Sequence, residues 1–196
     1  MKRTLVIGPL IGAILVVAAG CESPTKLGTT WKDPSVTGPL SFQKVAVVVV
    51  NSTPAERRAQ EDGLVAQIKK ATAVPSYTFI SDSELTDRDK VKQRIREGGF
   101  DAAVVLRLID SKKMTSYVPN EVSYWNAYYG YTTVQTPGYY VTDTVIRAEL
   151  SLYSVPEGKL LWAGSSSSTN PGSAKELALQ VARAAAEELR KQGLLQ

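Results

Sequence analysis

The chain has 196 residues and a formal net charge of +4, from 23 Lys and Arg residues against 19 Asp and Glu residues. It contains no histidine and a single cysteine. These absences exclude histidine general bases, histidine-containing metal sites, Ser-His and Cys-His nucleophiles and an internal disulfide. We therefore expect a protein without metal, cofactor or enzymatic activity, with a hydrolase that uses carboxylates alone as the remaining alternative.

The first twenty-one residues carry a targeting pattern. Lys2 and Arg3 precede an apolar segment from Leu5 to Ala19, and Gly20 then leads to Cys21. A basic start, a short apolar core and a small-residue cleavage site are typical of a secretory signal peptide. With its cysteine placed directly after the small residues, the stretch resembles a bacterial lipoprotein signal peptide and its lipobox.

The resemblance implies that residues 1–20 are removed and that Cys21 becomes the acylated, palmitate-bearing first residue. Ala18 departs from the usual lipobox, in which leucine is commonest at that place. Glu22, in place of the aspartate that retains lipoproteins at the inner membrane, implies the outer membrane with the domain facing the periplasm. Several acyl chains on one residue are expected to anchor it stably, since a single chain binds only marginally.

An uncleaved membrane-spanning helix is the alternative interpretation of this segment. Residues 4–20 are at the lower limit of the ~17–25 residues that a span needs, and they include Gly8, Pro9 and Gly12. Once Lys2 and Arg3 are removed, 21 basic residues face 19 acidic ones. No basic cluster with interleaved aromatics follows, so we expect no nucleic-acid partner.

Residues 21–40 are predicted to form a lipidated, flexible tether. The stretch is rich in Pro and Gly and has almost no apolar periodicity, which is typical of a linker. Trp31 is the exception, and we expect it to dock on the surface of the domain. The domain itself is predicted to occupy residues 41–196.

The first half of the domain alternates strands and helices. Residues 44–50 are an unbroken β-branched run, as in a strand that is covered on both faces. Thr53, Pro54 and Glu56 then provide a capping box for a helix to about residue 72. A short strand is predicted at 76–80, a second helix at 87–97 and a largely buried strand at 102–109. Helical crossovers of this length usually connect parallel strands.

The second half contains a hairpin and a final helix. Residues 141–153 alternate between apolar and polar side chains, and Pro156-Glu157-Gly158 forms a turn to a return strand that begins at Leu160. Ser173 and Glu176 form another capping box, for a helix over about 174–192 with Gly193 after it. The order β-α-β-α-β-β-β-α predicts an α/β, three-layer sandwich with a mixed sheet of roughly five strands.

A resemblance covers most of the mature chain, from Phe42 to Leu195. It rests on residues 44–48 (KVAVV), 99–105 (GFDAAVV), 148–153 (AELSLY) and 158–164 (GKLLWAG). These stretches are similar to the anticodon-binding-domain-like fold of envelope proteins, which includes the amino-terminal domain of TolB, the curli-secretion lipoprotein and the lipoprotein activators of penicillin-binding proteins. The resemblance implies a role in assembly, docking or secretion, and it carries over no catalytic residue.

An insertion at about 112–140 is the most distinctive part of the domain. It holds seven of the nine tyrosines, and Glu121 is the only charged residue between Tyr117 and Tyr140. Tyrosine suits protein interfaces and stacking on sugars. The candidate partner-binding residues are Tyr124, Trp125, Tyr128, Tyr129 and Tyr131. The alternative is an extended hairpin or ordered loop whose rings pack on the domain's own sheet.

Two further groups of residues have a structural and a functional interpretation. The ends of the predicted parallel strands bring polar residues to one rim, where open α/β sheets bind ligands: Asn51, Ser52, Thr53, Ser81, Asp82, Asp110 and Ser111. We interpret Ser52 and Thr53 as turn and cap, and the two aspartates as solvated loop residues. Ser111 precedes Lys112 and Lys113, but adjacency does not establish a Ser-Lys pair. The basic helix at 87–97 is interpreted as a solvent-exposed face, with contact to anionic lipid as the alternative.

These observations predict a non-enzymatic lipoprotein of the outer-membrane inner face. Its domain would act by contact with a protein partner in envelope assembly or secretion. The alternative is a binding module for peptidoglycan or another glycan that uses the tyrosine-rich segment. The membrane contact is expected through acylated Cys21.

Overall fold

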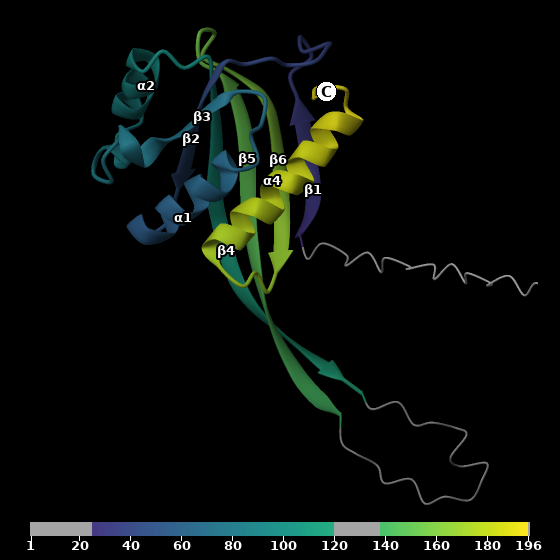
Figure 1. The fold of residues 1–196 in the computed structure, drawn as a ribbon. Helices are drawn as coiled ribbons and strands as arrows, with labels where there is room; N and C mark the ends of the chain where they lie inside the picture. Colours follow the sequence, from purple (N-terminus) through teal and green to yellow (C-terminus); the bar gives the residue numbers. More distant parts are fainter. Residues whose placement is uncertain (1–24, 120–137, 196) are drawn as a thin grey trace, which may run out of the picture.

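The computed structural model describes residues 25–119 and 138–195. They form an α/β domain with a six-stranded mixed sheet in the order β1-β6-β5-β4-β2-β3 (Figure 1). The elements in chain order are β1 (Thr25–Lys32), β2 (Lys44–Val50), α1 (Pro54–Val65), β3 (Thr72–Pro75), the 3-10 turns Ser76–Thr78 and Glu84–Thr86, α2 (Arg88–Glu97), β4 (Ala102–Val118), β5 (Tyr139–Ser154), β6 (Lys159–Thr169) and α4 (Ala174–Lys191).

Two hydrophobic layers sandwich the sheet, which confirms the predicted three-layer α/β class. On one face α1 and α4 cover β2, β4, β5 and β6, with Leu64, Leu106 and Leu177 at most 2 % exposed. On the other face α2 covers β2 and β4 through Ile95, which packs with Val48 and Ala103. The predicted parallel crossovers are also confirmed, because β2 pairs in parallel with both β3 and β4.

The capping box predicted at Thr53 is complete. Thr53 accepts a hydrogen bond from the Glu56 amide, and the Thr53 amide donates one to the Glu56 side chain. The side chains of Asp87 and Ser173 cap α2 and α4, but Glu176 accepts from the Gly172 amide, so the second predicted capping box is only half formed. Gly193 follows α4 with φ of +71°, a left-handed conformation that favours glycine and ends a helix.

The structure differs from the prediction at 25–40, where a flexible tether was expected. Residues 25–32 are the edge strand β1, paired antiparallel with β6. Thr25 shares a hydrogen bond with Ser168, and Leu40 donates its amide to the Leu194 carbonyl. An edge strand is held by its backbone ladder and needs few apolar side chains, so its polar composition resembled that of a linker. Trp31, which was expected to dock, is 46 % exposed.

Three element boundaries also differ. The strand expected at 76–80 lies at Thr72–Pro75, and Ser76–Thr78 is a 3-10 turn. Helix α1 ends at Val65, seven residues before the expected end. Strand β4 runs to Val118, well past Ile109. No helix in the part of the chain that the structure describes is long and apolar enough to cross a membrane.

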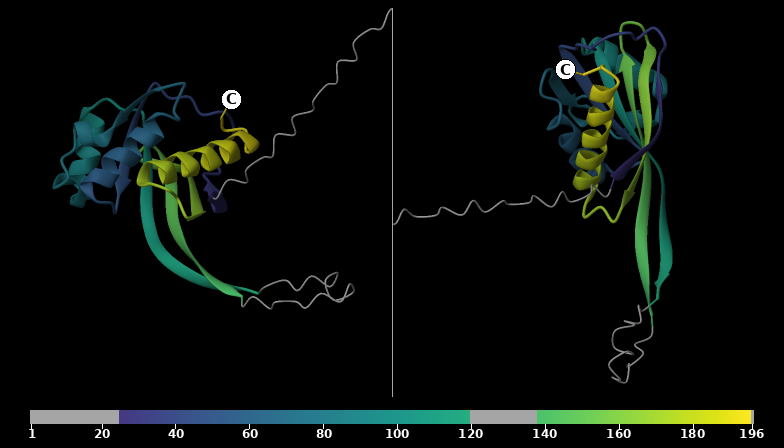
Figure 2. Two further views of the ribbon diagram at one scale, coloured as in Figure 1. Left: turned by 60° about the horizontal axis from the view of Figure 1, so that its bottom comes forward. Right: turned by 90° about the vertical axis from the view of Figure 1, so that its right-hand side faces the viewer.

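Beyond the body of the domain, β4 and β5 continue as a two-stranded ribbon. Figure 2 shows this ribbon projecting away from the helices and the rest of the sheet. Val50 of β2 pairs with Arg107, and Thr169 of β6 pairs with Val145. Beyond these positions, β4 and β5 pair only with each other in the described part of the chain. We call residues 113–118 with 139–144 the arm.

Candidate functional site

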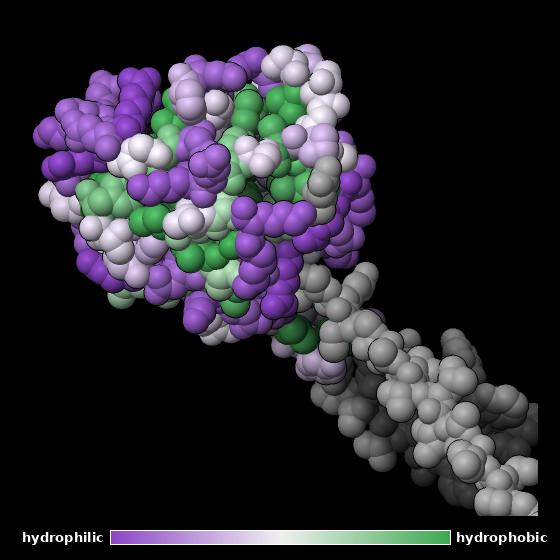
Figure 3. All heavy atoms as spheres, turned by 45° about the horizontal axis from the view of Figure 1, so that its top comes forward, coloured by the Kyte–Doolittle hydropathy of each residue, from purple (hydrophilic) through white to green (hydrophobic). Residues whose placement is uncertain are grey.

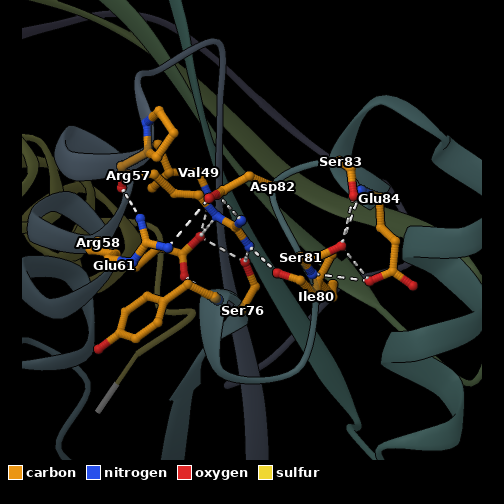
Figure 4. A network of polar contacts seen from close by, with 12 residues as sticks. Val49, Arg57, Arg58, Glu61, Ser76, Ile80, Ser81, Asp82, Ser83 and Glu84 are labelled. Carbon is orange, nitrogen blue, oxygen red and sulfur yellow. Dashed lines mark hydrogen bonds and ion pairs between the residues drawn. The ribbon is translucent and has the colours of Figure 1, made fainter.

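The rim at the carboxyl ends of the parallel strands is built around a buried arginine. Arg57 on α1 is 1 % exposed, and Glu61, one turn later, is fully buried. The guanidinium donates from Nε to Glu61 Oε1 at 3.0 Å and from Nη1 to Asp82 Oδ1 at 2.6 Å. Its Nη2 donates to Ser76 Oγ at 2.8 Å and to the Ile80 carbonyl at 3.0 Å (Figure 4).

Glu61 completes this network from the other side. Its Oε1 also accepts from the Val49 amide at 3.1 Å and from Ser76 Oγ at 2.6 Å, and its Oε2 accepts from the Tyr77 amide at 2.9 Å. A buried charge is tolerated when its hydrogen bonds are made, and here the Arg57 guanidinium and the Glu61 carboxylate each make several. The network therefore fastens the segment after β3 to α1 and β2.

Asp82 was interpreted as a solvated loop residue, and the structure assigns it a fixed partner. The hydrogen bond from Arg57 holds the pKa of its carboxyl below the usual range. Arg58 also approaches it, with Nη2 3.3 Å from Oδ2. Asp82 is thus part of the support for Arg57, although its side chain is 37 % exposed.

A groove of about 1030 Å³ lies beside this network, between α2 and the sheet. Asn51, Ser52 and Asp82 line it, so the structure brings together three of the predicted rim residues. The groove has a mostly basic border formed by Arg88, Lys92, Arg96 and Arg107. Among the described residues that line it, Asp82 is the one carboxylate.

The other predicted rim residues lie elsewhere or serve the turn. Thr53 is the cap of α1, and Ser52 Oγ donates to Gln60 Oε1 at 2.9 Å, as expected for turn and cap. Ser81 donates to Glu84, whose carboxylate pKa is lowered to about 2 by the Ser81 amide and Arg94. Asp110 and Ser111 lie past the rim, within β4.

Asp110 marks the base of the arm. Arg147 on β5 donates from Nε to Asp110 Oδ1 at 2.8 Å, and a second contact joins Nη2 to Oδ2. This bidentate contact lowers the pKa of the Asp110 carboxyl. Lys112 Nζ lies 3.7 Å from the same carboxylate. Lys112 is therefore directed to Asp110, and no Ser-Lys hydrogen bond at Ser111 occurs among the described residues.

The arm has two faces of different chemistry. Lys113, Thr115 and Tyr117 lie opposite Thr144, Thr142 and Tyr140 on one face. On the other, Met114, Ser116 and Val118 lie opposite Asp143, Val141 and Tyr139. The six pairs span about 20 Å at ~3.4 Å per residue. The second face is largely apolar, and no helix in the described part of the chain covers it.

The aromatic side chains at the end of the arm are open to solvent. Tyr117, Tyr139 and Tyr140 are 55 %, 62 % and 73 % exposed. Tyr117 and Tyr140 contact each other, with ring centroids 5.1 Å apart. The flanks of the predicted insertion thus form an extended hairpin, as one interpretation held, but these three rings do not pack on the body of the sheet.

The remaining candidates are the basic helix and the terminal residues. The basic side chains of α2 are exposed, as predicted, and Arg94 pairs with Glu84 at 2.8 Å. Cys21 and the predicted signal peptide lie outside the described residues. The same holds for the candidate contact residues Tyr124, Trp125, Tyr128, Tyr129 and Tyr131.

Sequence reasoning missed two features of this surface. Arg57 and Glu61 are four residues apart on α1 and look like an ordinary exposed helical ion pair. The signal that was available is their spacing from Leu64, which is on the expected core face. Glu61 lies one turn before Leu64 and Arg57 two turns before it, so all three share one face of the helix. The length of the arm was missed because residues 110–116 are polar.

No protein-family model matches the sequence, and no curated protein matches it. Solved structures are similar to it. PelC from Paraburkholderia phytofirmans, described as a dodecamer, is 12% identical with a TM-score of 0.44, over 88% of this chain and 99% of that one. Lipoprotein GNA1162 from Neisseria meningitidis is 13% identical with a TM-score of 0.42, over 76% and 99%.

A third structure, the hypothetical protein CT253 from Chlamydia trachomatis, is 8% identical with a TM-score of 0.40. It matches over 77% of this chain and 96% of that one. At these identities the similarities concern the course of the chain and not its activity.

Proposed function

We propose that this protein is a lipid-anchored envelope protein that acts by contact with a protein partner through the β4–β5 arm. The arm is the observation that carries the proposal. It extends the hairpin well past the sheet and contributes no side chain to either hydrophobic layer. A long structured projection that does not stabilise its own domain is suited to binding something else.

The chemistry of the arm favours a protein as the partner. Tyrosine and methionine side chains are enriched at protein interfaces, and Met114, Tyr139 and Tyr140 are all more than half exposed. The outer edges of both strands carry backbone groups without a neighbouring strand among the described residues. Such edges accept an added strand, so main-chain and aromatic contacts can act together.

The targeting pattern at the start of the sequence supports a role in the cell envelope. Lys2, Arg3 and the apolar segment before Cys21 resemble a lipoprotein signal peptide. In this proposal Cys21 carries the lipid, the outer membrane is the site of anchoring, and the domain faces the periplasm. The experiment is metabolic labelling with a fatty acid. The wild-type chain should take up label, and Cys21→Ser should not; equal labelling of both would contradict the anchor.

The arm contact is tested by site-specific photo-cross-linking in cells. A photoreactive residue at Tyr140, on the arm, should yield discrete cross-linked products that mass spectrometry identifies. The same residue at Gln93, which is exposed on α2, is the matched control and should give few products. Cross-links to another copy of the chain would identify self-assembly as the contact. Equal cross-linking at both positions would contradict the proposal.

A glycan-binding module is the second candidate, and the exposure of Tyr139 and Tyr140 is the observation that favours it. Tyrosine rings stack on sugars, and these two lie on opposite faces of the arm at the start of β5. Sedimentation with insoluble peptidoglycan separates the two functions. If the wild type sediments with peptidoglycan and Tyr139→Ala/Tyr140→Ala does not, the result would support glycan binding. If neither the wild type nor the variant sediments with it, the result would support the protein partner.

A further inference from the structure

A second feature, on the helical face of the sheet, is independent of the arm. A pocket of about 620 Å³ lies between the C-terminal half of α4, the segments 39–42 and 67–71, and the sheet. Its floor consists of apolar side chains of β2, β4 and β5: Val45, Val104, Leu150 and Leu152. Figure 3 shows hydrophobic residues gathered in a hollow on this side of the molecule, bordered by hydrophilic ones.

The packing of the two helices explains why this pocket exists. Helix α1 meets α4 near its own C-terminus, where a Cβ at Gly63 would lie 3.1 Å from the Lys175 carbonyl and 3.4 Å from Ala178 Cβ. Helix α1 then ends at Val65, so no helix of the part that the structure describes lies beside the C-terminal half of α4 on this face. The side chains that α4 directs into the pocket include three alanines, at 182, 185 and 186, which leave space above the sheet.

The charges at the pocket are of one sign. Lys69, Lys70 and Arg190 line it, and all three side chains are exposed at its border. Among the described residues that line the pocket there is no aspartate or glutamate. None of the three cations has an ion pair with another residue in the described part of the chain. An apolar interior beneath unpaired cations complements a ligand with an apolar chain and a negative head.

We propose that this pocket binds an anionic lipid by one acyl chain, with the chain over Val45 and Leu152 and the negative head group at Lys69, Lys70 and Arg190. The pocket volume lies within the usual ~300–1,000 Å³ of small-ligand sites. The ligand class is an alkyl chain that ends in a carboxylate or phosphate. Nothing in this assignment depends on the arm or on its partner.

The test is photolabelling of the full chain in phosphatidylcholine nanodiscs. The probe is hexadecanoic acid with a diazirine near the end of its alkyl chain, and labelled peptides are mapped by mass spectrometry. Label should concentrate on peptides that contain 39–45 and 182–190. Unlabelled hexadecanoate should compete, whereas its methyl ester, which has the same chain and no charge, should not.

Two variants separate the apolar and the charged parts of the site. Ala186→Phe fills the pocket from a half-buried helix position, and it should abolish labelling while the melting temperature is kept. Lys69→Gln/Lys70→Gln should weaken competition by hexadecanoate by about two- to thirtyfold, the range for two exposed ion pairs. Lys112→Gln/Lys113→Gln removes the same charge at the base of the arm and should leave the competition by hexadecanoate unchanged.

Three results would overturn the proposal. The first is labelling that persists in Ala186→Phe, and the second is an equal effect of the two lysine pairs. The third is labelling that appears only when Cys21→Ser removes the chain's own lipid, because that lipid would then be the occupant. If Ala186→Phe fails to fold, the lysine pairs still decide the outcome, since their side chains are exposed.

Discussion

The two halves of the β4–β5 hairpin have the same backbone pairing and opposite surroundings. In the body, Leu106 of β4 lies between β2 and β5 beneath the helices and is fully buried. Beyond the irregularity at Ile109, Met114 on the same strand is 56 % exposed. Side-chain burial fixes the first half, whereas only cross-strand contacts hold the second. Folding of the domain therefore places few constraints on the side chains of the arm, and these side chains can serve a contact with another molecule.

The same contrast applies to charge. Arg57 in the body and Arg147 at the base of the arm each hold an aspartate in a hydrogen-bonded ion pair. Arg57 is almost inaccessible to water, but the Arg147 side chain is 51 % exposed. Water replaces the lost partner of an exposed charge but not that of a buried one. Loss of the two arginines should therefore have very different costs.

The largest expected effect is that of Arg57→Met. It leaves the Glu61 carboxylate buried without its cation, which costs about 3–5 kcal/mol in comparable cases. Urea unfolding measures the loss as a lower midpoint with an unchanged slope. Arg58→Met, next along the helix and 49 % exposed on its side chain, is the control and should cost less than about 1 kcal/mol. Equal costs would mean that the buried network does not support the rim.

A pair of substitutions in one strand compares the two halves of the hairpin directly. Leu106→Ala removes a fully buried side chain and should cost about 2–5 kcal/mol through lost burial and a residual cavity. Met114→Ala, in the arm, should change the free energy of unfolding by less than about 0.5 kcal/mol. Thermal and urea unfolding of both variants provide the measurement. A large loss for Met114→Ala would show that the arm packs on the body.

Sequence patterns predicted the body far better than the arm. The unbroken run 44–50, the capping box at Thr53, the N-cap at Ser173 and the alternation along β5 all found their expected structure. In each case local chemistry and burial favour the same conformation, so a single stretch is sufficient evidence.

The features that the patterns missed depend on partners far along the chain. Strand β1 is a strand because β6, about 140 residues later, offers an open edge. Arg57 is buried because the segment that contains Ser76 and Asp82 folds over it. The polar stretch from Asp110 to Thr115 extends because β5 pairs with it. Composition and periodicity contain none of these pairings.

Acidic pH should destabilise the body, and two of its carboxylates have a pKa lowered to about 2. Hydrogen bonds from Ser35 and Lys159 lower the pKa of Asp33 to about 2, and the Ser81 amide and Arg94 lower that of Glu84 to about 2. In the unfolded chain these groups titrate near ~3.9 and ~4.3. Their stabilisation is therefore complete above pH ~4.5 and is lost as the pH falls towards 2.

Urea unfolding between pH 5 and pH 2 measures this loss. Asp33→Asn and Glu84→Gln should each be less stable than the wild type at pH 5 and should show a flatter decline. If the free energy of unfolding of both variants fell with pH as steeply as that of the wild type, the acid sensitivity would belong to other carboxylates.

The smallest effect on overall stability is expected at the tip of the arm. Tyr117 and Tyr140 contact each other across the ribbon with their rings tilted at 56°, and Thr115 and Thr142 share a hydrogen bond beside them, with oxygens 3.1 Å apart. Cross-strand aromatic pairs contribute about 0.5–1.5 kcal/mol. Because the arm shares no core with the body, Tyr117→Ala should let it open locally without unfolding the domain.

Native-state hydrogen exchange distinguishes the two kinds of opening. In Tyr117→Ala, amides of residues 113–118 should exchange up to about tenfold faster, as a loss of that size implies. Amides of β2, which exchange through global unfolding, should keep a strong dependence of their exchange rate on urea, whereas those of residues 113–118 should depend on urea only slightly. A strong urea dependence at residues 113–118 as well would mean that arm and body unfold as one unit. The arm would then be part of the structural support of the domain, and its exposed tyrosines would need another explanation than a contact surface.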